Sequence, residues 1–213
     1  MTDLVALFVS AFVTLFVVLD PPGCVPIFSS LMPGAGAAHR RSMALRSTGI
    51  AAGVLFAFGI FGESFLSALG ISLAAFRIAG GIMVFLIAID MVFEKRTERR
   101  EDRAEEVVRG REVVEEDISV FPMAIPMIAG PGSIAAIMLL TARVRGIEAH
   151  LVVFAALGAV LLVMLASLLA AGPLMRLMGD KIEAMITRLL GVVLAALAAQ
   201  FVVDGLREAF HIA

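Results

Sequence analysis

The chain is 213 residues long, with 61% hydrophobic and only 17% charged residues. This composition is far from that of a soluble globular domain and predicts a protein that crosses a membrane several times. The net charge of −2 comes without a basic stripe, so no nucleic-acid partner is expected. The single cysteine, Cys24, excludes an intrachain disulfide.

Hydropathy predicts six helical crossings in one all-α domain over residues 1–213. Each is roughly 20 residues long, as a hydrocarbon core about 30 Å thick requires. In chain order they cover residues 4–31, 47–69, 72–93, 118–141, 149–171 and 184–206. The first apolar run exceeds the length of a signal-peptide core and follows no basic region, so we expect it to be retained as a helix.

The first crossing contains a Pro/Gly cluster that begins at Asp20. Proline lacks a backbone N–H and displaces the preceding helical turn, so Pro21 and Pro26 are expected to stop one helix and favour the start of another. Asp20 is then expected to be an N-cap. Its carboxylate would accept N–H groups of the half-helix that starts near Gly23.

The fourth crossing contains a second cluster, which runs from Pro126 through Gly130, Pro131 and Gly132 to Ser133. The glycines permit a close approach of ligand to backbone, and the serine adds a hydroxyl at the new helix start. Unwound backbone at membrane depth survives only where it lines a cavity or is buried in protein. Matched breaks in crossings one and four, near the membrane midplane, therefore predict a transporter site.

The two halves of the chain resemble each other. Three landmarks recur in the same order at offsets of 109 to 111 residues: 21–23 with 130–132, 69–70 with 178–179, and 77–80 with 188–191. Because three helices is an odd number, the second copy must start on the opposite side of the membrane. The prediction is an inverted repeat of residues 1–93 and 118–213, joined by a charged linker at 94–117.

The distribution of Lys and Arg orients the chain. The segments after crossings one, three and five hold most of these residues, whereas the opposite face has only Arg77, Arg143, Arg145 and Arg207. The positive-inside rule therefore places the linker in the cytoplasm and both termini outside.

A small zwitterion suits the predicted site. Each half-helix start should present free N–H groups and about half a positive charge, which together attract a carboxylate. The substrate carboxylate would lie on the N–H groups of Gly130 to Ser133, while its ammonium group would meet Asp20 or freed carbonyls. Alternatively, both breaks are plain proline kinks that contact no ligand.

Other polar residues in the crossings are candidates for coupling or polar lining. Glu63 lies in crossing two and Gln200 in crossing six, where ionisable or amide groups are rare. For Glu63 the simpler alternative is an ion pair with Arg77 near the outer face. Asp204 and Arg207 are expected to be solvated.

The sequence offers little support for an enzyme. It has no H-E-x-x-H, G-x-S-x-G or phosphate-loop pattern, so active transport would need an ion gradient or a partner protein. Only Asp20 stands near the predicted centre, so we expect no metal site and no cofactor.

The motifs resemble those of a known family. Residues 20–28 are similar to the D-P-x-G-x-x-P-x-F signature of MarC-type inner-membrane proteins, and residues 126–134 are similar to their P-x-x-x-G-P-G-x-I signature. The resemblance covers essentially the whole chain. The residues that match the signatures are Asp20, Pro21, Gly23, Pro26, Pro126, Gly130, Pro131 and Gly132.

This resemblance implies an integral inner-membrane protein in the neutral amino acid transporter group, with glycine and alanine as plausible substrates and a proton as the coupling ion to test. Combined with the breaks, it predicts a secondary transporter that works by alternating access. The alternative is a channel-like pore, or a membrane scaffold or regulator that transports nothing. The oligomeric state is left open.

Overall fold

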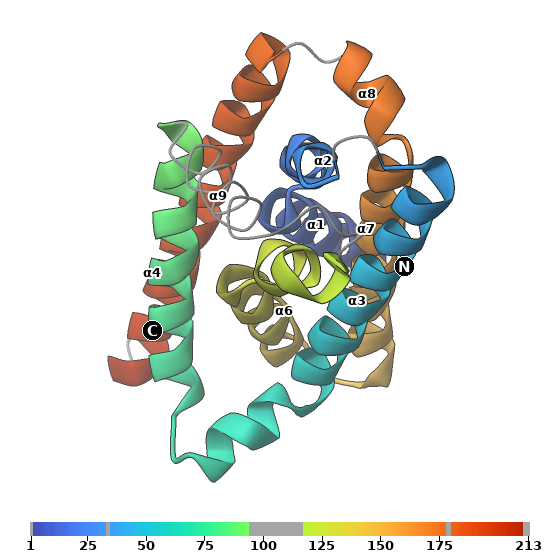
Figure 1. Cartoon of the computed structure of the whole chain (residues 1–213). Helices are drawn as coiled ribbons and strands as arrows, with labels where there is room; N and C mark the ends of the chain where they lie inside the picture. The colour runs from blue at the N-terminus through green and yellow to red at the C-terminus, as the bar shows by residue number, and fades with distance from the viewer. Residues whose placement is uncertain (1, 33–34, 94–116, 178–179, 211–213) are drawn as a thin grey trace.

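The computed structural model describes residues 2–32, 35–93, 117–177 and 180–210, and within them it contains helices and no strand (Figure 1). The helices are α1 (Thr2–Leu19), α2 (Pro21–Ser30), α3 (Ala37–Ala68), α4 (Leu73–Val92), η1 (Ser119–Ile128), α6 (Pro131–Arg143), α7 (Ile147–Leu169), α8 (Ala171–Leu177) and α9 (Asp180–Phe210). The prediction of an all-helical fold is confirmed for these residues. The predicted linker lies outside them except for Asp117.

Five stretches are long and apolar enough to cross a membrane: Leu4–Ser30, Ala37–Ala68, Leu73–Val92, Ile147–Leu169 and Arg188–Phe210. The η1–α6 pair, which is bent by 54°, makes a sixth if it is counted as one span. The sequence predicts six spans, and the structure gives that number only if the bent η1–α6 pair is counted as one span.

Several helix ends differ from the sequence prediction. Helix α3 begins at Ala37 rather than near residue 47, because the segment before residue 47 is rich in Ala, Arg, Met and Leu, which are good helix formers. Helix α9 likewise begins at Asp180 rather than at residue 184. The short helix α8 was not predicted. Hydropathy marks the apolar part of a helix and misses its polar extensions.

Helices α4 and α9 form the most extensive helix pair. Glycines let their backbones approach closely: a Cβ on Gly81 would lie 3.0 Å from the Ala198 carbonyl oxygen, and a Cβ on Gly205 would lie 3.0 Å from that of Ala74. Because residues later in α4 face residues earlier in α9, the two helices are antiparallel.

The broken helices lie in the middle of the molecule. In Figure 1, α1, α2 and α6 lie between the α4–α9 pair on one side and α3 with α7 on the other. The core between them is apolar. Its largest fully buried side chains include Leu15, Leu19, Ile27, Phe28, Ile128, Ile137 and Leu157. Asp20 at the first break is buried in this core, whereas the second break has both buried residues, such as Gly132, and exposed ones, such as Pro131.

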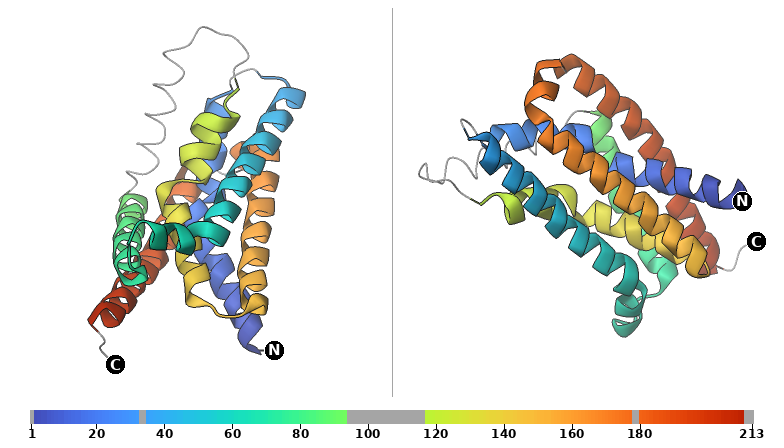
Figure 2. Two further views of the ribbon diagram at one scale, coloured as in Figure 1. Left: turned by 90° about the horizontal axis from the view of Figure 1, so that it is seen from below. Right: turned by 90° about the vertical axis from the view of Figure 1, so that its right-hand side faces the viewer.

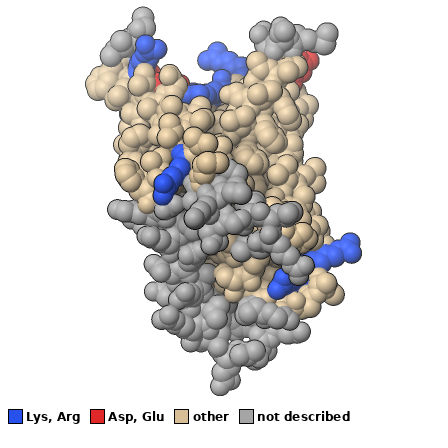
Figure 3. All heavy atoms as spheres, turned by 90° about the horizontal axis from the view of Figure 1, so that it is seen from above, with Lys and Arg blue, Asp and Glu red and all other residues tan. Residues whose placement is uncertain are grey.

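The molecule has two distinct ends. Figure 2 shows the start of α1, the α6–α7 turn and the end of α9 together at one end, here called the terminal end. The end of α2 and the starts of α3 and η1 lie at the other, here called the linker end. In Figure 3, several Lys and Arg side chains lie along the upper edge of the face, and the described surface below them is mostly neither Lys, Arg, Asp nor Glu.

Candidate functional site: two helix breaks that meet in the core

Asp20 separates α1 from α2. Its backbone is left-handed, with φ 54° and ψ 65°, a conformation that Asp tolerates better than most residues. Its N–H still donates to the Phe16 carbonyl at 2.9 Å, and its Oδ1 accepts the N–H of Gly23 at 3.2 Å. Asp20 is only 2% exposed. The predicted N-cap is confirmed.

Because Gly23 has no side chain, the Asp20 carboxylate can occupy the place where its Cβ would lie. A Cβ on Gly23 would lie 2.2 Å from Asp20 Oδ2 and 2.8 Å from its Cγ, distances that real Cβ atoms do not reach. A side chain at position 23 and the capping carboxylate therefore compete for one place. This explains in physical terms why aspartate and glycine are three residues apart in the first motif.

The start of α2 offers no free N–H groups, which contradicts the sequence prediction. Pro21 and Pro22 have no N–H, the N–H of Gly23 goes to Asp20 Oδ1, and the N–H of Cys24 goes to the Asp20 carbonyl at 3.1 Å. The donors that a helix start normally leaves unpaired are thus absent or already used.

The second break is longer than the motif suggested. Within η1, Phe121 (φ −128°, ψ 128°) and Ile125 (φ −130°, ψ 123°) are extended rather than helical. Each precedes a proline, Pro122 or Pro126, and a proline ring disfavours the helical conformation in the residue before it. The chain therefore departs from a regular helix well before the Pro126–Ser133 segment in which the sequence located the break.

Helix α6 starts at this break. Gly130 is the N-cap and makes no side-chain cap bond, and Pro131 occupies the first helical position, as prolines commonly do. The N–H of Ile134 donates to the Gly130 carbonyl at 3.0 Å. This leaves the N–H groups of Gly132 and Ser133 outside the hydrogen-bond ladder of the helix. A Cβ on Gly130 would lie only 2.5 Å from the Pro126 carbonyl oxygen.

The two breaks lie next to each other. A Cβ on Gly132 would lie 3.9 Å from Cγ1 of Val18, two residues before Asp20, and 2.2 Å from Cδ1 of Ile87 on α4. Helix α1 packs against α6, and α2 packs against η1. Most residues that match the family motifs are buried with Ser133, but Pro26 and Pro126 are half-buried and Pro131 is exposed.

Glu63 and Gln200 have different surroundings from those expected. Glu63 is exposed on α3, and the predicted ion pair between Glu63 and Arg77 is wrong, because Arg77 pairs with Glu208 of α9. Gln200 is also exposed, and its Nε2 donates to Asp204 Oδ1 at 2.6 Å within α9. The coupling roles suggested for Glu63 and Gln200 stay predictions.

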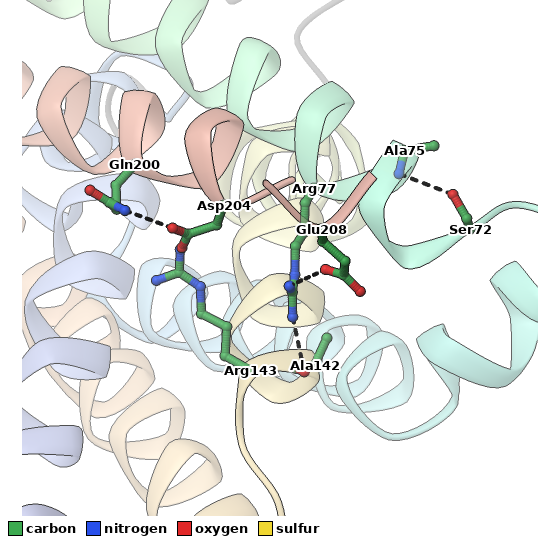
Figure 4. Close-up of polar contacts among 8 residues, drawn as sticks. All are labelled: Ser72, Ala75, Arg77, Ala142, Arg143, Gln200, Asp204 and Glu208. Carbon is green, nitrogen blue, oxygen red and sulfur yellow. Dashed lines mark hydrogen bonds and ion pairs between the residues drawn. The ribbon is translucent and has the colours of Figure 1, made fainter. Parts of the chain in front are cut away.

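A polar cluster at the terminal end was missed from the sequence. It contains Arg77, Arg143, Gln200, Asp204 and Glu208, and is called the terminal cluster below (Figure 4). The expectation that Asp204 is solvated holds in part, because its side chain is 29% exposed but pairs with Arg143. One signal was available: positions 200, 204 and 208 follow at four-residue spacing and so share one face of α9.

A separate ion pair lies at the linker end. Arg46 Nη1 of α3 lies 2.7 Å from Asp117 Oδ2, just before η1. The pKa of Asp117 is lowered, first by the hydroxyl of Ser119, which donates to its carboxylate, and next by the backbone N–H of Ser119 at 2.9 Å; the charge of Arg46 contributes further.

Among the described residues, no group of three or more His, Cys, Asp and Glu side chains could hold a metal ion. What the site does contain is two half-helix starts, one capping carboxylate and the backbone donors of α6. Its apolar surroundings and the five or six stretches that are long and apolar enough to cross a membrane define the class: a polytopic helical membrane protein.

The chain belongs to the MarC family: the protein-family model described as "MarC family integral membrane protein" matches residues 5–210. It is 34% identical to a UPF0056 membrane protein of Archaeoglobus fulgidus over 202 residues, which cover 94% of this chain and 92% of the relative. It is 35% identical to one of Methanocaldococcus jannaschii over 202 residues, covering 95% and 97%.

A bacterial relative is named as an inner membrane protein. The chain is 34% identical to the UPF0056 inner membrane protein YhgN of Escherichia coli over 201 residues, which cover 93% of this chain and 95% of YhgN. No solved structure matches the chain. The family and the apolar helices together identify a multi-pass inner-membrane protein, and the names of the relatives state no substrate.

Proposed function

We propose that this protein is a secondary transporter of small neutral amino acids that works by alternating access. One observation carries the proposal: two broken spans place their breaks side by side in the core, with Gly132 of α6 beside Val18 at the end of α1. Discontinuous helices of this kind build the midplane sites of many transporters, because their ends provide backbone groups for a substrate.

The helix contacts support an inverted repeat. The broken pair α1–α2 packs on α7, the broken pair η1–α6 packs on α3, and α4 packs on α9. In the two halves, 1–93 and 118–213, α1–α2 corresponds to η1–α6, α3 to α7 and α4 to α9. Exchanging corresponding helices therefore gives the same set of contacting pairs. The antiparallel α4–α9 pair also fits copies that cross the membrane in opposite directions. Rocking of one repeat against the other would then alternate access to the breaks.

The proposed pose uses the start of α6 alone for the substrate carboxylate. The N–H groups of Gly132 and Ser133 would bind it, since the donors of α2 are already used. The ammonium group would lie near the Asp20 carboxylate. Ile87 and Val18 crowd Gly132, which favours glycine and alanine over amino acids with larger side chains.

The proposed orientation places the linker end in the cytoplasm and both termini outside. Arg40, Arg41 and Arg46 lie at the start of α3 at the linker end, where the positive-inside rule expects cations.

A specific observation favours the alternative that the protein is a scaffold or regulator. Asp20 and Gly23 satisfy each other by a hydrogen bond and by close packing, so the first break is stable without a ligand. Under this alternative both breaks only shape the fold.

Flux of labelled glycine and alanine into proteoliposomes, with and without a proton gradient, separates these functions. Gly132→Leu should abolish uptake, because the new side chain must enter the space held by Ile87 and Val18. Gly53→Leu is the matched control, since nothing lies within 4 Å of a Cβ on Gly53. Both variants must first be shown to be folded.

Saturable uptake that Gly132→Leu abolishes and Gly53→Leu retains would support the proposal. A dependence on the proton gradient would identify the coupling ion. Uptake that does not saturate would indicate a pore, and no uptake by folded protein under any gradient would refute amino acid transport and favour a scaffold.

A further inference from the structure

The terminal cluster joins the far end of the broken span to the α4–α9 pair. Arg143 is the last residue of α6, and its guanidinium group pairs with Asp204 of α9. The same group lies over the ring of Phe201, 4.3 Å from the ring centroid, and Phe201 is itself 1% exposed. An ion pair and a cation–π contact therefore hold one end of α6 on α9.

Arg77 adds the third helix to this cluster. From α4 it pairs with Glu208 of α9, and its Nη2 donates to the Ala142 carbonyl of α6 at 3.3 Å (Figure 4). Ala142 lies in the last turn of α6, where helix carbonyls have no partner within the helix. Arg77 thus ties α6 to both α4 and α9.

The terminal cluster is less exposed than the ion pair at the linker end. The side chains of Arg143 and Asp204 are 32% and 29% exposed, whereas those of Arg46 and Asp117 are 58% and 47% exposed. Ion pairs that are partly withdrawn from water are screened less than exposed pairs. The Arg143–Asp204 pair at the terminal end is therefore less screened by water than the Arg46–Asp117 pair at the linker end.

Helix α6 is well placed to transmit a movement from this cluster to the breaks. It is a single rigid element of 13 residues that starts at the Gly130 break and ends at Arg143. The bend of 54° between η1 and α6 lies at its start, so displacement of its far end changes the geometry at Gly132.

We infer that the terminal cluster is a releasable latch that holds α6 against α4 and α9 and closes the core from the terminal end. Release of the Arg143–Asp204 pair lets the end of α6 move away and admits water to the breaks. As a gate in a transport cycle the latch rests on the proposed function, but the closure itself does not depend on it.

The chain carries a natural reporter for this opening. Cys24, its only cysteine, is 0% exposed and follows the first break. Its alkylation by a small, charged, membrane-impermeant thiol reagent can be timed on purified protein in nanodiscs without any engineered label. No substrate is needed, so the measurement is independent of amino acid transport.

We expect Arg143→Asp and Asp204→Arg each to raise the alkylation rate of Cys24 by about fivefold or more, because each removes an interhelical ion pair and opposes like charges. The double variant that exchanges the two charges restores the ion pair but not the contact with the Phe201 ring, so its rate should fall below that of both single variants. Arg46→Gln, which removes the linker-end pair, is the matched control and should leave the rate unchanged.

Single variants that leave the rate unchanged would overturn the latch. So would an equal increase in Arg46→Gln, because the reagent would then report general loosening rather than opening at one end. A double variant that is as fast as the single variants would show that the charge pair does not hold the bundle closed. If the rates behave as expected while flux is absent, the latch stands and amino acid transport fails.

Discussion

Gly23→Ala tests whether the first break depends on one shared space. The added Cβ would lie 2.2 Å from Asp20 Oδ2, so the carboxylate must turn away and release the N–H of Gly23. Loss of an N-cap costs about 1 kcal/mol. The buried N–H of Gly23, left without this acceptor, costs about 1–3 kcal/mol more.

Alanine also has a helix-forming advantage of about 1 kcal/mol over glycine, which offsets part of this cost. The net expectation is that Gly23→Ala lowers the free energy of unfolding by about 1–3 kcal/mol. Gly53→Ala is the control, because its Cβ meets nothing within 4 Å; it should be neutral or stabilising by up to about 1 kcal/mol.

The assay is reversible unfolding in detergent for both glycine variants, for Asp20→Ala, and for Asp20→Ala combined with Gly23→Ala. Once Asp20 is truncated, the space at position 23 is free, so Gly23→Ala should then cost nothing. The double-mutant cycle should show a coupling of about 2 kcal/mol. Additive effects, or a Gly23→Ala variant as stable as the starting protein, would refute the shared-space account.

Substitutions at three further positions test other parts of the structure. The folded state lowers the pKa of Asp117, so its carboxylate stabilises the fold above the unfolded pKa of about 3.9, and this contribution is lost as the pH falls through the lower folded pKa. Between pH 6 and pH 3, thermal unfolding should therefore show a smaller decrease in stability for Asp117→Asn than for the unsubstituted protein. An equal decrease in both proteins would contradict this role of Asp117. Arg143→Lys keeps the charge but stacks less well on Phe201, so its unfolding free energy should lie between those of the unsubstituted protein and Arg143→Gln, which should lose about 1 kcal/mol. Ile87→Ala frees space beside Gly132, so larger neutral amino acids such as valine should compete better against labelled glycine; an unchanged preference would count against Ile87 as the size limit.

The apolar spans and the Asp20 cap were predictable because their causes are local. A bilayer core fixes the length of each apolar run, and the order Asp20, Pro21, Gly23 by itself describes a helix stop followed by a capped start. The same local view failed at the donors of α2. It assumed that the start of α2 has free N–H groups like any other helix start. In fact Pro21 and Pro22 have no N–H, and Asp20 accepts the N–H of Gly23.

The terminal cluster could not be predicted because its partners are far apart in the chain. Arg77 and Glu208 are separated by 131 positions, and Arg143 and Asp204 by 61. Only packing of α4, α6 and α9 brings them together. Sequence spacing indicated which face of α9 is polar, but not which cations that face would meet.

The contact between Asp20 and Gly23 also restricts the routes by which such a sequence can change. Because the carboxylate already fills the volume of a side chain at position 23, a lineage that first replaced Gly23 would pass through a destabilised protein. A lineage that first replaced Asp20 would lose one cap and could then accept alanine at position 23 without a further loss. The two positions therefore form one unit of variation, and across the family a change at the glycine should be found only where the aspartate has already been replaced.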